Sequence, residues 1–240
     1  MDMPAAAIEA IGLSAGYGAT RVLDGLSFAA PPGARLAVLG RNGAGKSTLL
    51  SALVGQARRI EGVIRLDGED ISEWPTAERA LKGLGYVPQG RWIFPSLSVE
   101  ENLLVGLKNR RRDAIEEAYG LFPRLKERRA NAGDRLSGGE QQMLSIARTI
   151  LGRPTALLLD EPLEGLAPVI CDELMGVLTQ LAASGEMTIV LVEQRLQSAL
   201  DFADSAIVLE RGRIAWRGAP AALAADHDAV ERLLGVGGLH

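Results

Sequence analysis

Apolar and polar residues alternate along the first thirty residues of the chain, with glycines between them. This period of two predicts antiparallel strands at residues 8–13 and 27–30. Two later runs, residues 155–159 and 187–192, are continuously apolar except for one threonine in each. Such runs are typical of parallel strands that are buried on both faces of a sheet. The pattern therefore predicts an α/β protein that also has an antiparallel β part.

A glycine-rich segment joins a compact strand at residues 35–39 to a stretch of helical spacing at 46–54. The segment fits the pattern GxxxxGK[ST], whose backbone N–H groups surround nucleotide phosphates between a strand and a helix. Its lysine would pair with the β- and γ-phosphates, and the hydroxyl that follows would coordinate Mg²⁺. We therefore predict a nucleotide site at Gly40, Arg41, Asn42, Gly43, Ala44, Gly45, Lys46, Ser47 and Thr48.

Two acidic residues, Asp160 and Glu161, follow the apolar run at 155–159. Ligands bind outside the carboxyl ends of the strands in an open parallel sheet, so Asp160 is placed to bind Mg²⁺. Glu161 is the candidate base that polarises water for attack on the γ-phosphate. An acidic pair after an apolar strand is more often a solvated strand end. The phosphate loop upstream favours the functional interpretation.

The region between these motifs, residues 96–151, has mostly helical spacing. Ser98 and Glu101 form a capping box there, and Pro123 ends an amphipathic stretch at residues 113–122. Ser137 is the expected N-cap of a helix at residues 138–151. A helix N-terminus attracts anions, so this segment is free to hold an ATP bound by a partner chain. The segment comprises Leu136, Ser137, Gly138, Gly139 and Glu140.

Further turn signals and apolar runs predict the remaining secondary-structure elements. They indicate a strand and tight turn at residues 62–68, a closing hairpin at 206–217 and a helical tail from 220. We predict one domain over residues 1–240. Its nucleotide-binding core, with a β subdomain, comprises 1–95 and 152–240, and its helical subdomain comprises 96–151.

The composition limits the classes of protein to which the chain can belong. With 47% hydrophobic and 23% charged residues, the chain has the composition of a globular protein. A formal net charge of -4 gives no electrostatic reason to expect nucleic acid as a partner. No signal peptide is evident at the N-terminus, and the apolar runs are shorter than the ~20 residues of a membrane span. Any membrane role is expected to come through partners.

Together, the phosphate loop, the acidic pair and the segment at residues 136–140 resemble the ATPase subunit of ATP-binding cassette (ABC) transporters over nearly the whole chain. The resemblance implies a P-loop NTPase (RecA-like) core, ATP and Mg²⁺ as cofactors, and a head-to-tail dimer. In that family, residues 136–140 correspond to the signature sequence, which closes over the γ-phosphate of the opposing ATP. Two transmembrane permease subunits, and indirectly a periplasmic or extracellular solute-binding protein, are the further implied partners. The implied location is peripheral, on the cytoplasmic face of the plasma membrane.

The resemblance also assigns roles outside these motifs. Tyr17 matches the aromatic residue that stacks on adenine, and Gln89 matches the glutamine that reaches Mg²⁺ and the attacking water. Trp92 and Phe94 lie where the family has a groove for a coupling helix of the membrane subunit. Packing inside the helical region is an equal alternative for these two aromatic residues.

Two positions depart from the family's commonest pattern. Gln194 stands where many members have a switch histidine, and its amide can bond a phosphate oxygen but cannot carry a positive charge. Ala167 replaces the usual aspartate of the loop that faces the other subunit. We therefore expect weaker hydrolysis at this chain's own site, and a second, non-identical ATPase that carries the histidine as its partner.

Several short segments resemble one branch, the second ATPase subunit of bacterial branched-chain amino acid importers. Urea and short-amide importers share much of this pattern and remain an alternative. An exporter subunit, a soluble family member acting on ribosomes or DNA, and a small-molecule kinase are less favoured. The last of these leaves Gln89 and residues 136–140 unexplained. The segments lie at residues 87–91, 121–123, 138–143, 165–168 and 191–194.

Overall fold

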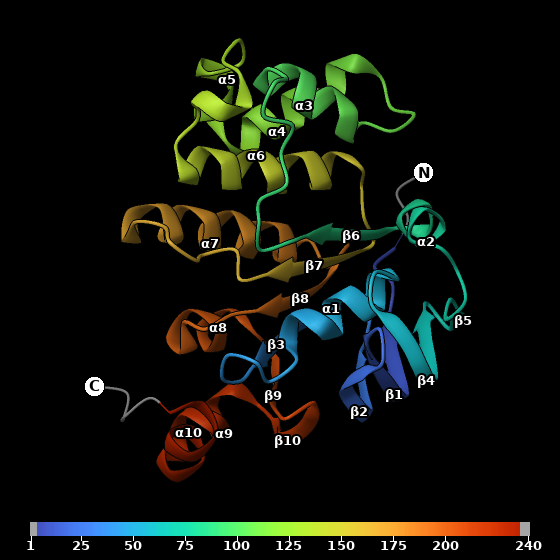
Figure 1. Cartoon of the computed structure of the whole chain (residues 1–240). Coiled ribbons are helices and arrows are strands. Elements are labelled where there is room, and N and C mark those ends of the chain that lie inside the picture. Colours follow the sequence, from blue (N-terminus) through green and yellow to red (C-terminus); the bar gives the residue numbers. More distant parts are fainter. Residues whose placement is uncertain (1–3, 236–240) are drawn as a thin grey trace.

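The computed structural model describes residues 4–235. Its central sheet has six strands in the order β10-β9-β3-β8-β7-β6, and all but the edge strand β10 run parallel. The helices lie on both faces of this sheet (Figure 1). The strands are β3 (Arg35–Leu39), β6 (Leu84–Val87), β7 (Ala156–Asp160), β8 (Thr188–Val192), β9 (Ser205–Glu210) and β10 (Arg213–Gly218).

A second, antiparallel sheet has the order β2-β1-β4-β5 and lies beside helix α1 (Figure 1). Its strands are longer than predicted because they continue through bulges, where Gly12 and Gly62 let the backbones approach closely. A Cβ on Gly62 would lie 2.4 Å from the Gly12 carbonyl oxygen. The strands are β1 (Ile8–Tyr17), β2 (Thr20–Ala30), β4 (Arg58–Leu66) and β5 (Glu69–Asp70).

Side chains of the central strands alternate between two apolar cores. Leu158 and Val190 face α1 and the antiparallel sheet, whereas Leu157 and Leu191 face the helices of the other side. All four are completely buried, as expected of parallel strands covered on both faces. A third cluster joins the β3 and β9 end of the sheet to α8–α10.

The helical elements between β6 and β7 gather at one end of the molecule, next to α7 (Figure 1). Pro123 does not only end α4, as predicted. It is also the first residue of α5, where its missing N–H costs nothing. Among residues 4–235, no helix has the length and apolar character to cross a membrane. The helices are α1 (Lys46–Val54), α2 (Thr76–Lys82), α3 (Val99–Gly106), α4 (Ile115–Leu121), α5 (Pro123–Glu127), α6 (Gly138–Leu151), α7 (Pro168–Ala183), α8 (Leu196–Phe202), α9 (Pro220–Ala225) and α10 (His227–Leu234), with 3₁₀ turns at Arg112–Ala114 and Gly133–Arg135.

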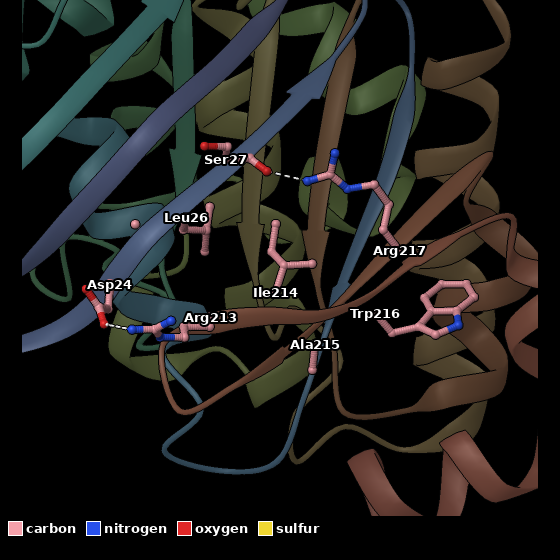
Figure 2. A pocket seen from close by; sticks show the side chains of 9 residues that line it. Asp24, Leu26, Ser27, Arg213, Ile214, Ala215, Trp216 and Arg217 are labelled. Atoms are coloured by element: carbon pink, nitrogen blue, oxygen red, sulfur yellow. Dashed lines mark hydrogen bonds and ion pairs between the residues drawn. The ribbon is translucent and has the colours of Figure 1, made fainter.

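The two sheets meet where edge strand β10 crosses edge strand β2 (Figure 2). Arg213 forms an ion pair with Asp24, and the Arg217 guanidinium donates to the Ser27 carbonyl oxygen. A shallow cavity of about 500 Å³ remains between the two strands. Both edges are thus tied to each other by charged side chains, which limits pairing with other chains. The turn between β9 and β10 also links the antiparallel sheet to the phosphate loop, because Gly212 accepts from the Asp24 N–H of β2 and donates its own N–H to the Ala44 carbonyl.

Candidate functional site

The predicted phosphate loop, residues 40–47, connects β3 to α1 as expected from its sequence. Gly40, Gly43 and Gly45 all have positive φ, at 148°, 79° and 106°. A Cβ on Gly40 would lie 2.5 Å from the Leu209 carbonyl oxygen, and one on Gly45 would lie 2.9 Å from Leu23. Glycine is therefore required by the protein's own packing as well as by the left-handed backbone.

Lys46 is almost completely buried at the start of α1. Its Nζ donates to the Gly40 carbonyl at 2.9 Å and lies 3.4 Å from Glu161 Oε1. A cavity of about 500 Å³ opens above this ammonium group. The cavity has the size of a nucleotide or cofactor pocket, and it is lined by Val22, Asn42, Gly43, Gly45, Lys46, Ser47, Thr48, Gln89, Glu161, Glu164 and Gln194.

Asp160 ends β7 directly beneath this cavity. Its Oδ1 accepts a hydrogen bond from Ser47 Oγ at 3.0 Å, and its Oδ2 lies 3.5 Å from the Tyr86 hydroxyl. Burial, and secondarily the Glu161 charge, raise the pKa of Asp160 to about 6. Burial, and the Asp160 charge with it, also raise the pKa of Tyr86. The Ser47 hydroxyl and the Asp160 carboxylate thus bring two oxygen atoms to within 3.0 Å of each other.

These donors fit Mg²⁺ rather than a softer metal. Ser47, Gln89 and Asp160 offer only oxygen atoms of a hydroxyl, an amide and one carboxylate, and Mg²⁺ in nucleotide sites takes one or two carboxylates together with phosphate oxygens and waters. Among residues 4–235, no group of three or more His, Cys, Asp or Glu side chains is arranged to hold a metal alone. The nucleotide phosphates would have to complete the coordination.

Glu161 is the point on which the other polar side chains converge. It is buried and adopts a left-handed backbone, φ 48°, and its N–H donates to the Val192 carbonyl at 2.9 Å. Its Oε2 accepts from Gln194 Nε2 at 2.5 Å and faces Gln89 Nε2 at 3.4 Å. A non-glycine residue held at positive φ is strained, and such strain clusters at functional sites. The predicted residues Glu161, Gln89, Gln194 and Lys46 are therefore side by side.

Two further acids belong to this region and have no counterpart in the sequence motifs. Glu164 Oε2 accepts from Gln89 Nε2 at 2.8 Å. Glu193, completely buried after β8, accepts the backbone N–H groups of Leu163, Gln194 and Arg195. Burial raises the pKa of Glu193, while these hydrogen bonds oppose the rise. Glu193 thereby ties the loop after β7 to the residue that contacts Glu161.

The segment predicted as a second anion site, residues 136–140, does not line this cavity. It begins α6, where Ser137 Oγ accepts from the Glu140 N–H at 3.3 Å and Glu140 Oε2 accepts from the Ser137 N–H at 2.8 Å. This reciprocal capping box leaves the N–H groups of Gly138 and Gly139 without intrahelical partners. Any anion bound there belongs to a site separate from the chain's own cavity.

Four predicted nucleotide residues, Tyr17, Gly40, Arg41 and Ala44, lie outside the cavity lining. Tyr17 is half exposed at the end of β1, and Val22 is the aliphatic residue that reaches the cavity instead. The Arg41 guanidinium turns away and donates to the carbonyls of Glu231 and Arg232 at the end of α10. Arg41 therefore serves the cavity only through its backbone, because its carbonyl lies 3.4 Å from Lys46 Nζ.

Comparison with known proteins identifies this arrangement. Residues 23–164 match the model of the ABC transporter family, and this segment contains the phosphate loop, the signature segment and the acidic pair. The chain belongs to the ABC transporter family. It is an ATP-binding ATPase subunit of such a transporter, and its fold is that of a P-loop NTPase. Tyr17 and Gln194 lie outside the matched segment.

Individual relatives agree with the ABC assignment over nearly the full length. The chain is 41% identical to the high-affinity branched-chain amino acid transport ATP-binding protein BraG of Pseudomonas aeruginosa, over 91% of this chain and 95% of BraG. It is 34% identical to a probable branched-chain amino acid transport ATP-binding protein, LivF, of Archaeoglobus fulgidus, over 94% and 97%. A solved ATP-binding subunit of an ABC transporter superposes with a TM-score of 0.80 at 27% identity, over 97% of this chain and 95% of that one.

Proposed function

We propose that the chain is the energy-coupling ATPase of a bacterial importer for branched-chain amino acids. The observation that carries the catalytic part is the convergence of Lys46, Gln89 and Gln194 on Glu161 beside the phosphate loop. The similarity to BraG supports the substrate class. Urea or short amides are the alternative cargo, since substrate contacts lie on other subunits.

The geometry supports in-line hydrolysis of ATP. The N–H groups of the phosphate loop and Lys46 would hold the β- and γ-phosphates, with Thr48 beside them and Tyr17 against the adenine. Bound Mg²⁺, held by Ser47, Gln89 and Asp160, would neutralise charge on the phosphates. Glu161 would accept the proton of the attacking water, and Gln194 would orient the Glu161 carboxylate through its amide.

The separation of the two anion sites supports a dimer. Residues 136–140 begin α6 away from the chain's own cavity, so their free N–H groups are available to the γ-phosphate of another chain. We infer a head-to-tail arrangement with a second ATPase subunit. Because the Gln194 amide cannot carry a positive charge, the preferred partner is non-identical and supplies a histidine at its own site.

An apolar groove supports docking to membrane subunits. The groove holds about 650 Å³ between the end of β6 and α2, and Trp92 and Phe94 are exposed at its rim by 60% and 44%. Asn102 holds Phe94 through both backbone groups, and the Arg148 guanidinium lies 5.0 Å from the Phe94 ring centre. Their exposure favours docking over internal packing. We infer that a helix of each of two permease subunits binds such a groove, which places the chain on the cytoplasmic face of the plasma membrane. A solute-binding protein would act indirectly.

Uptake measurements test this function. Cells that lack the chain would receive wild type or Glu161→Gln, with labelled leucine, isoleucine, valine, urea and acetamide supplied in turn. We expect wild type alone to restore uptake of the aliphatic amino acids, because Glu161→Gln keeps the nucleotide site but removes the base. Restored uptake of urea or acetamide would move the chain to the other importer class. Restoration by both proteins would contradict the role of Glu161.

A further inference from the structure

Glu164 is a carboxylate that belongs to neither the phosphate loop nor the acidic pair. It lines the nucleotide cavity together with Gln89 and Glu161. Its Oε2 lies 2.8 Å from Gln89 Nε2, closer than the 3.4 Å between the same nitrogen and Glu161 Oε2. Glu164 is therefore the nearer of two acidic partners that hold one end of the Gln89 amide.

The two ends of a glutamine amide are chemically different. The nitrogen carries two hydrogens and only donates, the oxygen only accepts, and an ionised carboxylate only accepts. The two hydrogens of Gln89 Nε2 thus match two carboxylate oxygens. Rotating the amide by half a turn would place its oxygen against both anions with no proton between them. The two acids therefore decide which end of the amide faces them, and the oxygen points elsewhere.

We propose that Glu164 is a positioning residue that orients the Gln89 amide so that Oε1 is presented to the cation accompanying the nucleotide. The inference rests on the proposed function, in which Gln89 is an oxygen donor to Mg²⁺. A hard cation binds an amide oxygen and is repelled by the N–H end. The orientation of this one side chain therefore decides whether it helps or opposes cation binding.

The backbone that follows Gln89 explains why a residue from another segment is needed to hold the Gln89 side chain in place. Arg91 and Trp92 have positive φ, at 63° and 30°, conformations that are costly for residues with a Cβ. This segment is not held by a helix or sheet ladder of its own. Glu164 contacts it twice, because its side chain accepts from Gln89 and its carbonyl lies 3.4 Å from Arg91 Nη2.

Binding of a fluorescent, non-hydrolysed ATP analogue, with EDTA and then with Mg²⁺, tests the proposal without using activity. The ratio of the two dissociation constants reports the contribution of the cation. Glu164→Gln keeps the size of the side chain, but its amide can donate as well as accept and no longer selects one orientation. Whatever the loss of one negative charge does to the constant in EDTA, we expect the ratio of the two constants to show a Mg²⁺ benefit reduced by roughly fivefold, the scale of one typical hydrogen bond.

Glu164→Asp separates positioning from simple attraction of the cation. It keeps the charge but is one methylene too short for the 2.8 Å contact, so positioning predicts a loss similar to that of Glu164→Gln. A wild-type ratio in Glu164→Asp would overturn the proposal in favour of charge alone. Glu127→Gln, an exposed acid on α5, is the control and should match wild type.

A double-mutant cycle with Gln89→Ala gives the decisive result. If Glu164 acts through Gln89, then Glu164→Gln causes no further loss of the Mg²⁺ benefit once Gln89 is alanine. An equal loss in both backgrounds would overturn the proposal. Failure of the wild-type protein to bind the analogue in either condition would instead contradict the proposed ATPase function, so the two failures are distinguishable.

Discussion

At the scale of single residues, Asp160 is a buried acid whose surroundings oppose its charge. The side chain is 2% exposed, and its neighbour Glu161 is also an acid. The Ser47 hydroxyl and the Lys46 ammonium offset only part of this conflict, which is why burial raises the pKa of Asp160 to about 6. The nucleotide-free protein therefore holds an acid that is more easily protonated than in the unfolded chain.

This conflict predicts a pH-dependent stability. The usual pKa of aspartate is 3.8 and the folded value is about 6, so between these two pH values the folded protein keeps a proton that the unfolded chain has released. The contribution of Asp160 to the free energy of unfolding is full below 3.8 and is lost as the pH rises through about 6. The two-unit shift corresponds to ~3 kcal/mol at neutral pH.

Urea unfolding of the nucleotide-free protein in EDTA, from pH 4.5 to 8, measures this effect. Asp160→Asn is the comparison, because asparagine has the same shape and still accepts the hydrogen bond from Ser47. We expect the variant to become more stable than wild type as the pH rises, and the two proteins to converge at the acidic end. Parallel curves over the whole range would contradict the raised pKa.

At the scale of elements, α3 and α6 begin in the same way. Each has a serine N-cap and a glutamate three residues later, and in each both reciprocal hydrogen bonds form. The first box, Ser98 and Glu101, lies at the start of the helical region. The second, Ser137 and Glu140, begins the proposed signature helix. Because the two capping boxes have the same local geometry, the same substitution in each should change helix stability equally. Any difference in ATPase activity between the two variants then reports a functional role of one box.

The pair of boxes predicts two different outcomes for one substitution. Ser98→Ala and Ser137→Ala should each lower the free energy of unfolding by about 1 kcal/mol, the usual loss for a serine N-cap. Only Ser137→Ala should also lower the ATPase activity of the assembled dimer, because in the proposed dimer its hydroxyl and helix N-terminus would face the other chain's γ-phosphate. Threonine at either position retains the cap and is the control. Equal activity of the two alanine variants would remove Ser137 from the proposed interface.

Some elements could be predicted from sequence with their bounds. The bounds of the helices Lys46–Val54 and Gly138–Leu151 could be predicted, because a glycine-rich loop marks the start of the first and a serine cap marks the start of the second. Helix α7, Pro168–Ala183, has no side-chain cap at its start and went unassigned. The short parallel strand β6 contains Gly85 and only four residues, too few for a period to show. The lengths of β1 and β2 were underestimated because bulges interrupt their alternation.

In the candidate site, too, some residues could be predicted from the sequence and others could not. Lys46, Asp160 and Glu161 have sequence signals, since motif spacing and strand ends mark them. Glu193 lies in one of the family-like segments, but no motif assigns a role to it or to Glu164, because their partners are brought to them by the fold. Gln89 is 75 residues from Glu164 along the chain, and Leu163 is 30 from Glu193. Only the pairing of β6 with β7 and of β7 with β8 places these segments together.

At the scale of the whole molecule, the proposed function assigns two half-sites to the chain. The cavity near Lys46 would hold one set of phosphate contacts, and the N-terminus of α6, which does not line that cavity, would provide another set. Each half-site is completed by the opposite half of a second chain in the proposed head-to-tail dimer. We infer that this chain's own site is the weaker one, since the Gln194 amide lacks the positive charge that a histidine would offer.

Mixing experiments test this asymmetry. Purified chain alone should hydrolyse ATP slowly, and addition of the transporter's second, histidine-bearing ATPase should raise the rate on the order of tenfold or more, the scale of one electrostatic contact to the γ-phosphate. Glu161→Gln, mixed with that partner and ATP, should elute as a dimer in gel filtration. A full transporter-like rate from the chain alone would overturn the requirement for a non-identical partner.

The contact between Arg41 and α10 has a practical consequence for engineering. The guanidinium of this phosphate-loop residue closes the carbonyl end of α10, about 190 residues later in the chain. The nucleotide loop is thus anchored to a helix that no motif includes. Removing α10 should therefore loosen the loop although every motif residue remains. A fluorophore attached to an exposed position of α10, such as Asp228, should therefore change its emission when a nucleotide binds to the phosphate loop.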